Sequence, residues 1–302
     1  MSSPDTARGL FPLAGSPNVV PVDVEEITGR LSLRFGPEVA GWAARVPDRV
    51  ADLARRWDLT PVGPLSQGAS SVVAEFRAGD VPAVLKLSPD EPFLAEQTAV
   101  LRLLGPSGRV PAVLAEEAGA VLMAAVRPGT EVADLPEPPT APEWADLVTP
   151  LHAVAPPPGA RDLADRCAES FARIGRRVTA STPVTPATWE RAQDRCRALL
   201  GAGPRVLLHG DLHPGNVLVG PRGLVAIDPR PCVGDPCFDV VDFALEAAGR
   251  EGVADRSARL AEACGLDPDR LLGWCRVLAP VIAMSRSDDR PALEELLGLA
   301  AP

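Results

Sequence analysis

The chain has 302 residues, of which 46% are hydrophobic, and its formal net charge is -10 with an isoelectric point near 4.9. This acidic balance argues against nucleic acid as a partner, because binding along a nucleic-acid backbone needs clustered Lys and Arg. No apolar run approaches the roughly 18 residues of a membrane span, so we expect no membrane segment, and the length suits two lobes that each bury a core.

The N-terminal part of the chain is predicted to contain a leader and a helical cap. Residues 1–22 hold four prolines and lack the basic start and unbroken apolar stretch of a signal peptide. We therefore expect a flexible leader and a cytoplasmic protein. Residues 36–59 place apolar side chains at helical spacing, interrupted by Pro47, which predicts one or two helices that cap the first lobe.

Three antiparallel strands are predicted next, with a hairpin turn at Ala78-Gly79-Asp80, and they cover residues 62–66, 72–76 and 83–87. The first two are joined by Ser66-Gln67-Gly68-Ala69-Ser70-Ser71. A glycine here would let backbone amides approach the phosphates of a nucleotide, although a plain hairpin explains the segment equally well. The position of this loop before Lys86 favours a phosphate-binding role for Ser66, Gln67 and Gly68.

Lys86, in the third of these strands, is the only lysine among the 30 basic residues of the chain. Because arginine is used at the other cationic positions, we infer that a compact ammonium is needed here and that a planar guanidinium cannot replace it. In kinases a lysine on the third strand grips the α- and β-phosphates of ATP, whereas a lone exposed lysine is the alternative. Its predicted ion-pair partner is Glu96, at the start of an amphipathic helix that ends near Leu104, with Glu91 as the second choice.

Two further strands, at 111–118 and 120–126, complete a five-stranded antiparallel sheet. The Arg-Pro-Gly sequence that follows ends the sheet, so the predicted domains are an N-terminal nucleotide-binding lobe over 1–126 and a helical C-terminal lobe over 127–302. Helical periodicity predicts that the second lobe contains helices at 143–154, 162–178, 186–200, 235–250, 254–264, 268–284 and 290–301. His152 lies on an apolar stripe of the first of these and is expected to be a core histidine.

A polar loop between two apolar runs carries the densest motif of the chain, His209-Gly210-Asp211-Leu212-His213-Pro214-Gly215-Asn216. The second apolar run ends at Asp228. An acid, an amide five positions later and a second acid after another apolar run form the layout of a kinase-type phosphoryl-transfer loop. Asp211 would take the proton of the attacking hydroxyl, while Asn216 and Asp228 would hold the Mg²⁺ ions that bridge the phosphates of ATP.

The histidines and cysteines of this region admit two interpretations. His209 and His213 are expected to hold the loop through hydrogen bonds. A metal cluster of these histidines with Cys232 and Cys237 is the alternative, although the glycines and prolines around both histidines argue against the helical presentation that such pairs usually have. The six cysteines of the chain lack the paired spacing of a zinc ribbon, and in a reducing compartment we expect most of them to be buried thiols.

Only six residues separate Asp228 from Asp235, which leaves no room for a long activation segment and predicts an always-active kinase of small molecules. The loop resembles that of the aminoglycoside phosphotransferase family, which reads His-Gly-Asp-x-His-x-x-Asn, and residues 226–239 resemble the streptomycin 6-kinase and hydroxyurea phosphotransferase branch. The resemblance implies a bilobal α+β fold like that of protein kinases. It also implies that adenine bonds to the backbone of the lobe crossing, at Met123, Ala124 and Val126, although Met123 is equally well explained as a core residue.

The resemblance further implies that phosphate passes from ATP to an aminoglycoside-type antibiotic, namely streptomycin at its 6-hydroxyl, and that the reaction confers resistance. Residues 235–269 hold nine acids against three Arg, which favours a cationic acceptor, although a solvated helical face is the alternative. Asp235, Asp239 and Asp242 are the candidate partners of a guanidinium group on the acceptor, and a helix-capping role is equally open for Asp235.

Two other functions stay open on the sequence alone. One is a kinase for another small hydroxyl compound, such as hydroxyurea or an antibiotic-pathway intermediate. The other is a non-catalytic pseudokinase that binds a nucleotide or a drug. The second is disfavoured because the residues of the expected machinery are all present, namely Lys86, Asp211, Asn216 and Asp228.

Overall fold

The computed structural model describes residues 22–68, 70–201, 203–285 and 288–301, which form two compact units. The first unit comprises the described residues up to Glu91 together with Glu117–Met123. The second comprises Pro92–Glu116 and the described residues from Ala124 onward. The last passage of the chain into the second unit, at Ala124, lies close to the predicted domain boundary after residue 126. Residues 92–116, which the prediction placed in the first domain, belong to the second unit.

From residue 22 to the start of the sheet the structure contains α1 (Val24–Phe35), a 3-10 turn η1 (Pro37–Val39), α2 (Ala40–Ala43) and α3 (Val46–Arg56). The predicted helices at 36–59 do not include α1, whose start is capped by Asp23 through a hydrogen bond from the backbone N–H of Glu26 (3.0 Å). Pro47 lies in the first turn of α3, where a missing N–H costs no hydrogen bond, so it starts a helix rather than interrupting one. The predicted leader lies outside the described residues except for Val22.

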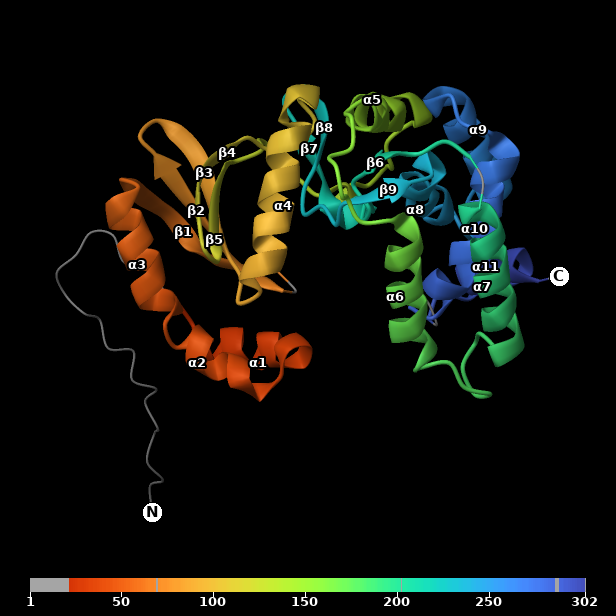
Figure 1. The fold of residues 1–302 in the computed structure, drawn as a ribbon, viewed down its shortest axis with the longest axis horizontal. Helices are drawn as coiled ribbons and strands as arrows, with labels where there is room; N and C mark the ends of the chain where they lie inside the picture. The colour runs from red at the N-terminus through yellow and green to blue at the C-terminus, as the bar shows by residue number, and fades with distance from the viewer. Residues whose placement is uncertain (1–21, 69, 202, 286–287, 302) are drawn as a thin grey trace, which may run out of the picture. The chain divides into compact units, whose positions relative to one another are not determined.

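The predicted five-stranded antiparallel sheet is confirmed, with the strand order β1-β2-β3-β5-β4 (Figure 1). Its strands are β1 (Leu59–Gly68), β2 (Ser71–Ala78), β3 (Val81–Leu87), β4 (Val113–Glu117) and β5 (Ala120–Ala124). Gly79 and Gly119 make the turns of the hairpins β2–β3 and β4–β5 with φ of 58° and 73°, which glycine adopts without steric cost. Helix α3 packs against β1, and the guanidinium of Arg56 bonds both carboxylate oxygens of Glu117 at the end of β4.

The second unit is mostly helical, as predicted, and its helices are α4 (Glu91–Leu104), α5 (Ala141–His152), α6 (Leu163–Gly175), α7 (Pro186–Leu200), α8 (Val241–Leu245), α9 (Val253–Cys264), α10 (Pro268–Ala283) and α11 (Arg290–Ala300). Two short antiparallel sheets lie among them, formed by β6 (Val206–Leu208) with β9 (Cys232–Gly234) and by β7 (Val217–Gly220) with β8 (Gly223–Ala226). Trp144 of α5 stacks on Phe243 of α8 in the buried core, with ring centroids 3.5 Å apart. These four strands position the polar loop described below.

The prediction of one helix over 235–250 is wrong. The segment consists of a 3-10 turn, η5 (Pro236–Asp239), and the short helix α8, with a bend at Val240, whose φ is -101°. Asp235 starts η5 by accepting the backbone N–H of Cys237 (3.0 Å). The bend directs Asp239 inward to the polar loop, where its carboxylate accepts backbone hydrogen bonds that a regular surface helix could not give it.

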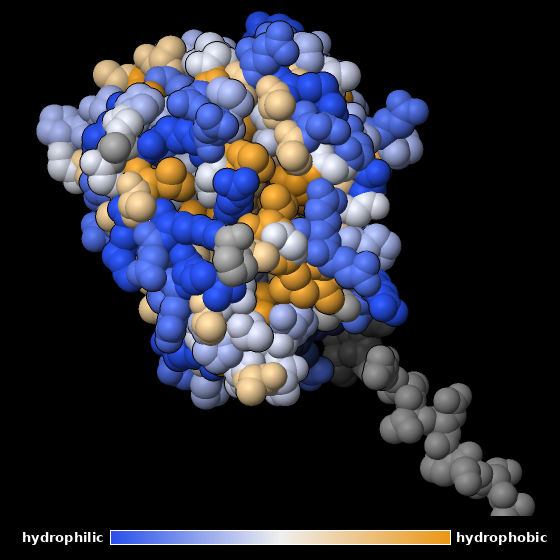
Figure 2. Space-filling view, turned by 90° about the vertical axis from the view of Figure 1, so that its right-hand side faces the viewer, coloured by the Kyte–Doolittle hydropathy of each residue, from blue (hydrophilic) through white to orange (hydrophobic). Residues whose placement is uncertain are grey.

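None of the described helices combines the length and the apolar character that a membrane span requires. Figure 2 shows the side of the molecule that lies at the right of Figure 1, where α7, α9, α10 and α11 are labelled. Hydrophilic residues cover much of this face and surround smaller groups of apolar ones.

Candidate active site

The strands β6, β7 and β8 fix the ends of the polar loop 209–216. Strand β6 leads into the loop, and a 3-10 turn, η4 (Pro214–Asn216), leads out of it into β7. Because β7 pairs with β8 in the register Val217 to Ala226, the chain returns so that the N–H of Ile227 donates to the carbonyl of Asn216 (2.9 Å). Asn216 and Asp228 therefore lie at the same end of one hairpin, as their predicted shared role requires.

Glycine is the only residue type that fits at position 210 of this loop. Its φ is 76°, and a Cβ built on it would lie 2.0 Å from the carbonyl oxygen of Arg230. The two segments are closely joined there, since the N–H of Arg230 donates to the carbonyl of His209 (2.8 Å). The glycine before Asp211, where protein kinases have an arginine, is thus required by backbone contact as well as by conformation.

The carboxylate of Asp239 holds the beginning of the loop through hydrogen bonds. One carboxylate oxygen accepts the backbone N–H of Gly210 (2.8 Å), and the other accepts the N–H of His209 (2.8 Å) and contacts Nε2 of His152 (3.0 Å). Burial opposes ionisation, but the hydrogen bond and charge of His152, with the nearby His209 and Gly210, bring the pKa of Asp239 below its ordinary value. The side chain has no exposed surface, so the prediction that Asp239 contacts the acceptor is wrong.

Asp235 is also a structural residue. Its carboxylate accepts hydrogen bonds from the N–H of Cys237 and from the indole of Trp274 (2.6 Å), and it forms an ion pair with Arg270. The residue is only 4% exposed. Of the two roles left open by the sequence, the structure supports capping and not contact with the acceptor, because the buried carboxylate is already engaged by Cys237, Trp274 and Arg270.

The three histidines hold the loop region together. His152 is a core histidine as predicted, paired with Asp239. Nε2 of His209 contacts the carbonyl of Ile227 (2.9 Å), and burial lowers the pKa of this imidazole. Nδ1 of His213 accepts the N–H of Gly215 (3.2 Å).

The structure gives no support to a cysteine–histidine metal cluster. Across the described ranges there is no group of three His, Cys, Asp or Glu side chains placed to hold a metal ion. All six cysteines are free thiols, five of them buried, and burial raises the pKa of Cys232 to about 12. The expectation of buried thiols is confirmed for these five.

Two arginines hold the carboxylate of Asp211. Nη2 of Arg166 donates to Oδ1 (2.9 Å), and Nε of Arg230 lies 3.4 Å from Oδ2. The backbone carbonyl of Asp211 accepts a hydrogen bond from the side-chain amide of Asn216 (2.8 Å). Sequence reasoning did not single out Arg166, because it lies on α6, 45 residues before Asp211, and no local pattern connects the two.

Asn216 and Asp228 have the donor chemistry that Mg²⁺ needs. The amide nitrogen of Asn216 is engaged by the carbonyl of Asp211, which leaves its carbonyl oxygen as a possible ligand. Asp228 has a φ of 58°, a left-handed conformation that costs a non-glycine residue about 1–3 kcal/mol and that is concentrated at functional sites. One carboxylate and one amide oxygen fit a hard cation that takes its other ligands from phosphates and water.

Asp242 lies in a cavity of about 430 Å³ beside the polar loop, lined also by Ala133, His213, Leu245, Glu246, Ile282 and Ser285. Burial raises the pKa of Asp242 to about 7, with further increases from the charges of Asp211, Asp239 and Glu246 and a decrease from Arg166. The structure thus keeps Asp242 as a candidate for acceptor binding and adds Glu246 and His213 to the same cavity.

The predicted nucleotide-binding residues occupy several elements. Lys86 is buried on β3, paired in register with Val73, and Met123 is buried on β5. The backbone of 66–68 belongs to β1, but the side chains of Ser66 and Gln67 lie outside the described ones, and nothing tests the roles given to Gly68, Ala124 and Val126. Glu96 is exposed on α4, and its neighbour Gln97, which the sequence did not single out, donates to the carbonyl of Pro229 (2.9 Å), next to Asp228. The nucleotide contacts of all these residues stay predictions.

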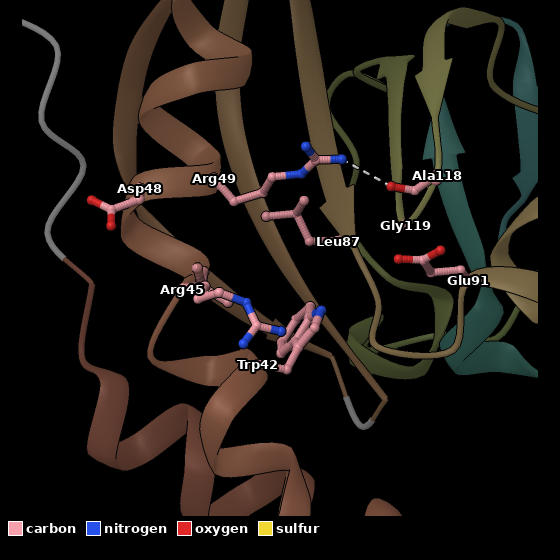
Figure 3. Close-up of a pocket in the computed structure, with 9 residues that line it drawn as sticks. Trp42, Arg45, Asp48, Arg49, Leu87, Glu91, Ala118 and Gly119 are labelled. Atoms are coloured by element: carbon pink, nitrogen blue, oxygen red, sulfur yellow. Dashed lines mark hydrogen bonds between the residues drawn. The ribbon is translucent and has the colours of Figure 1, made fainter.

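A second cavity, of about 510 Å³, lies within the first unit. Figure 3 shows Trp42 and Arg45 on one side of it and Glu91 and Gly119 on the other, while Arg49 reaches the carbonyl of Ala118 (3.0 Å). Among the residues predicted to bind nucleotide, only the second choice, Glu91, lines this cavity. Of these two cavities, the one that contains Asp242 is also lined by His213, Pro214 and Gly215 of the polar loop, so it is the one next to the predicted catalytic motif.

Comparison with known proteins finds relatives over most of the chain. Residues 56–289 match the family model described as aminoglycoside/hydroxyurea antibiotic resistance kinase. The chain is 33% identical to the streptomycin 6-kinase of Streptomyces glaucescens over 83% of this chain and 86% of that protein, and 31% identical to the hydroxyurea phosphotransferase of Kitasatospora aureofaciens over 84% and 76%. A solved aminoglycoside phosphotransferase, in ternary complex with AMP-PNP and hygromycin B, shares the fold with a TM-score of 0.58 at 17% identity, covering 82% of this chain and 96% of that one.

Proposed function

Because the chain belongs to the aminoglycoside/hydroxyurea antibiotic resistance kinase family, we propose that it transfers a phosphoryl group from ATP to a hydroxyl of a cationic aminoglycoside-type antibiotic. The preferred acceptor is streptomycin at its 6-hydroxyl, and its phosphorylation confers resistance. The observation that carries the proposal is the loop in which Asn216 is hydrogen-bonded to the carbonyl of Asp211 and to the N–H of Ile227, the residue before Asp228. The relatives named streptomycin 6-kinase and hydroxyurea phosphotransferase support the substrate class.

In this mechanism each residue of the loop has one task. Asp211 orients the acceptor hydroxyl and takes its proton as the oxygen attacks the γ-phosphorus of ATP, with ADP as the leaving group. Asn216 and Asp228 would hold Mg²⁺, which neutralises the phosphates when it is bound. Lys86 would grip the α- and β-phosphates, with Glu96 as its partner. Most of the rate increase then comes from positioning and charge neutralisation rather than from covalent chemistry.

The cavity around Asp242 supports a cationic acceptor. Two acidic side chains, Asp242 and Glu246, line it, and carboxylates are suited to pair with guanidinium groups in bidentate fashion. Hydroxyurea is the second candidate, because a relative of nearly equal identity carries that name. An uncharged acceptor of that size would gain little from the two acids, so the cavity favours the antibiotic.

A coupled assay of ADP release tests the function. The wild-type chain is supplied with ATP and Mg²⁺ and then with streptomycin, other aminoglycosides, hydroxyurea or water alone. We expect streptomycin to stimulate ADP release far above the rate with water and to gain one phosphoryl group by mass spectrometry. Stimulation by hydroxyurea alone would select the second candidate, and no stimulation by any acceptor would indicate a chain that binds without catalysis.

The pKa of Asp242 predicts how acceptor affinity depends on pH. Because burial and its acidic neighbours raise this pKa to about 7, the carboxyl is mostly neutral at pH 6 and mostly ionised at pH 8. A guanidinium keeps its charge throughout this range, so only the protein side of the pair changes. We expect the KM for streptomycin to fall by up to about tenfold from pH 6 to pH 8, since the ionised fraction of a carboxyl with a pKa of about 7 rises from roughly one tenth to roughly nine tenths over this range.

Steady-state kinetics of wild type and Asp242→Asn at pH 6, 7 and 8 check this prediction. The variant cannot ionise at this position and should have a high KM that does not vary across the range. A wild-type KM that is equally constant, or one that rises with pH, would remove Asp242 from acceptor recognition.

A further inference from the structure

We propose that Arg166 is a positioning residue that fixes the orientation of the catalytic carboxylate, an inference that rests on the function proposed above. Its guanidinium makes three separate contacts: Nη2 donates to Oδ1 of Asp211 (2.9 Å), Nε to the carbonyl of Gly210 (3.3 Å), and Nη1 to the hydroxyl of Ser170 (2.9 Å). One side chain therefore holds both the reacting group and the backbone that carries it.

These contacts require the shape of arginine. The three acceptors lie in different directions from one side chain, and a planar guanidinium presents donors in a fixed fork that can meet them together. A lysine ammonium would place its charge at a single point on a flexible stem and could not reproduce the geometry. Ser170 stands one turn after Arg166 on α6 and holds the guanidinium from its own helix.

Helix α6 is fixed to the strands that lead into the catalytic loop. The N–H of Val233 on β9 donates to the carbonyl of Arg161 (2.7 Å), just before α6 begins. Leu163 packs so closely on Gly234 that a Cβ on the glycine would lie 2.4 Å from the Cβ of the leucine. Strand β9 pairs with β6, which ends at Leu208 directly before the loop. The sheet of β6 and β9 therefore supports both α6, which carries Arg166, and the loop that carries Asp211.

The two arginines around Asp211 differ in their exposure and in their distance from the carboxylate. The side chain of Arg166 is 12% exposed, whereas that of Arg230 is 29% exposed, and its contact with Oδ2 is longer, at 3.4 Å. Because Oδ1 is held by Arg166, we assign Oδ2 as the oxygen that meets the acceptor hydroxyl and receives its proton. A carboxylate held in this way is preorganised for the reaction, and misplacement by about 1 Å can cost on the order of 10²-fold in rate.

Kinetics of Arg166→Ala, Arg166→Lys and Arg173→Ala test the proposal, with streptomycin as acceptor. We expect Arg166→Ala to lower kcat by about 10²-fold while the KM for ATP changes by less than about twofold, because the nucleotide contacts are left intact. Arg166→Lys should recover only part of kcat. Added guanidinium chloride at millimolar concentration should raise the kcat of Arg166→Ala. Arg173 is exposed on the same helix, so Arg173→Ala should match wild type.

A second variant and a crystal structure test the role of Arg166 without relying on the kinetics of Arg166→Ala. If Arg166→Ala does not fold, Ser170→Ala removes one contact of the guanidinium and should lower kcat several-fold with the KM for ATP unchanged. A crystal structure of the Arg166→Ala or Ser170→Ala variant should show the Asp211 carboxylate displaced, a result that does not depend on the acceptor. An unchanged kcat or an unmoved carboxylate overturns the proposal. Failure of the proposed function is a different result, because it appears as a wild-type chain that no acceptor stimulates.

Discussion

Replacement of Asp211 by asparagine is expected to lower kcat by about 10²–10⁴-fold, the range that a positioned base contributes, while ATP still binds with nearly unchanged affinity. The amide has the same size and can accept a hydrogen bond from Arg166 at one oxygen, but it cannot take the proton of the acceptor. The contact between Asn216 and this residue uses the backbone carbonyl of Asp211, so the substitution leaves it in place. The loop should keep its conformation and lose only the group that accepts the proton.

Single-turnover phosphorylation of streptomycin and calorimetric titration with a non-hydrolysable ATP analogue measure the two properties separately. Asp165→Asn is a matched control, because Asp165 is an exposed aspartate of the same unit, in the first turn of α6. It should behave as wild type in both assays. An Asp211→Asn variant with full turnover would contradict the role of base, and loss of ATP binding would show that the substitution disturbs the loop itself.

The parts of the site that could be predicted from the sequence are those that local geometry determines. The spacing from Asp211 to Asn216 is set by one turn of 3-10 helix, and the hairpin β7–β8 returns Asp228 to the same place. Alternating apolar residues likewise identify the strands β2 and β3, because one face of each is buried. Such features depend on neighbours within a few residues, which a single sequence displays.

The parts that could not be predicted depend on distant partners. Asp235 and Asp239 fit the pattern of a polar helical face, but both are buried, and most of the groups that they meet are 29 to 87 residues away in sequence. Arg166 is likewise brought to Asp211 only by the contact of α6 with β9. No periodicity or spacing identifies a partner that the fold alone brings close.

The correction for Asp239 leads to the second large effect, since a carboxylate that organises the loop should matter first for stability. Replacing Asp239 by alanine leaves the N–H groups of His209 and Gly210 and the ring of His152 without their acceptor. Removing one partner of a buried, hydrogen-bonded ionic group costs about 3–5 kcal/mol. We expect the free energy of unfolding of the second unit to fall by about this amount, with kcat lowered as well because Gly210 and Asp211 lose their support.

Urea denaturation of wild type, Asp239→Ala and the exposed control Asp255→Asn at several pH values tests this account. The folded pKa of Asp239 lies below its ordinary value of 3.8, so its stabilisation is complete above pH 3.8 and is lost as the pH falls through the folded pKa. The difference between wild type and Asp239→Ala should therefore be largest and constant near neutral pH and shrink only in strong acid. An Asp239→Ala variant that is as stable as the Asp255→Asn control but has a raised KM for streptomycin would instead return Asp239 to the acceptor site. Replacing a residue that binds the acceptor lowers the affinity for the acceptor, whereas replacing a residue that supports the loop lowers the stability of the fold.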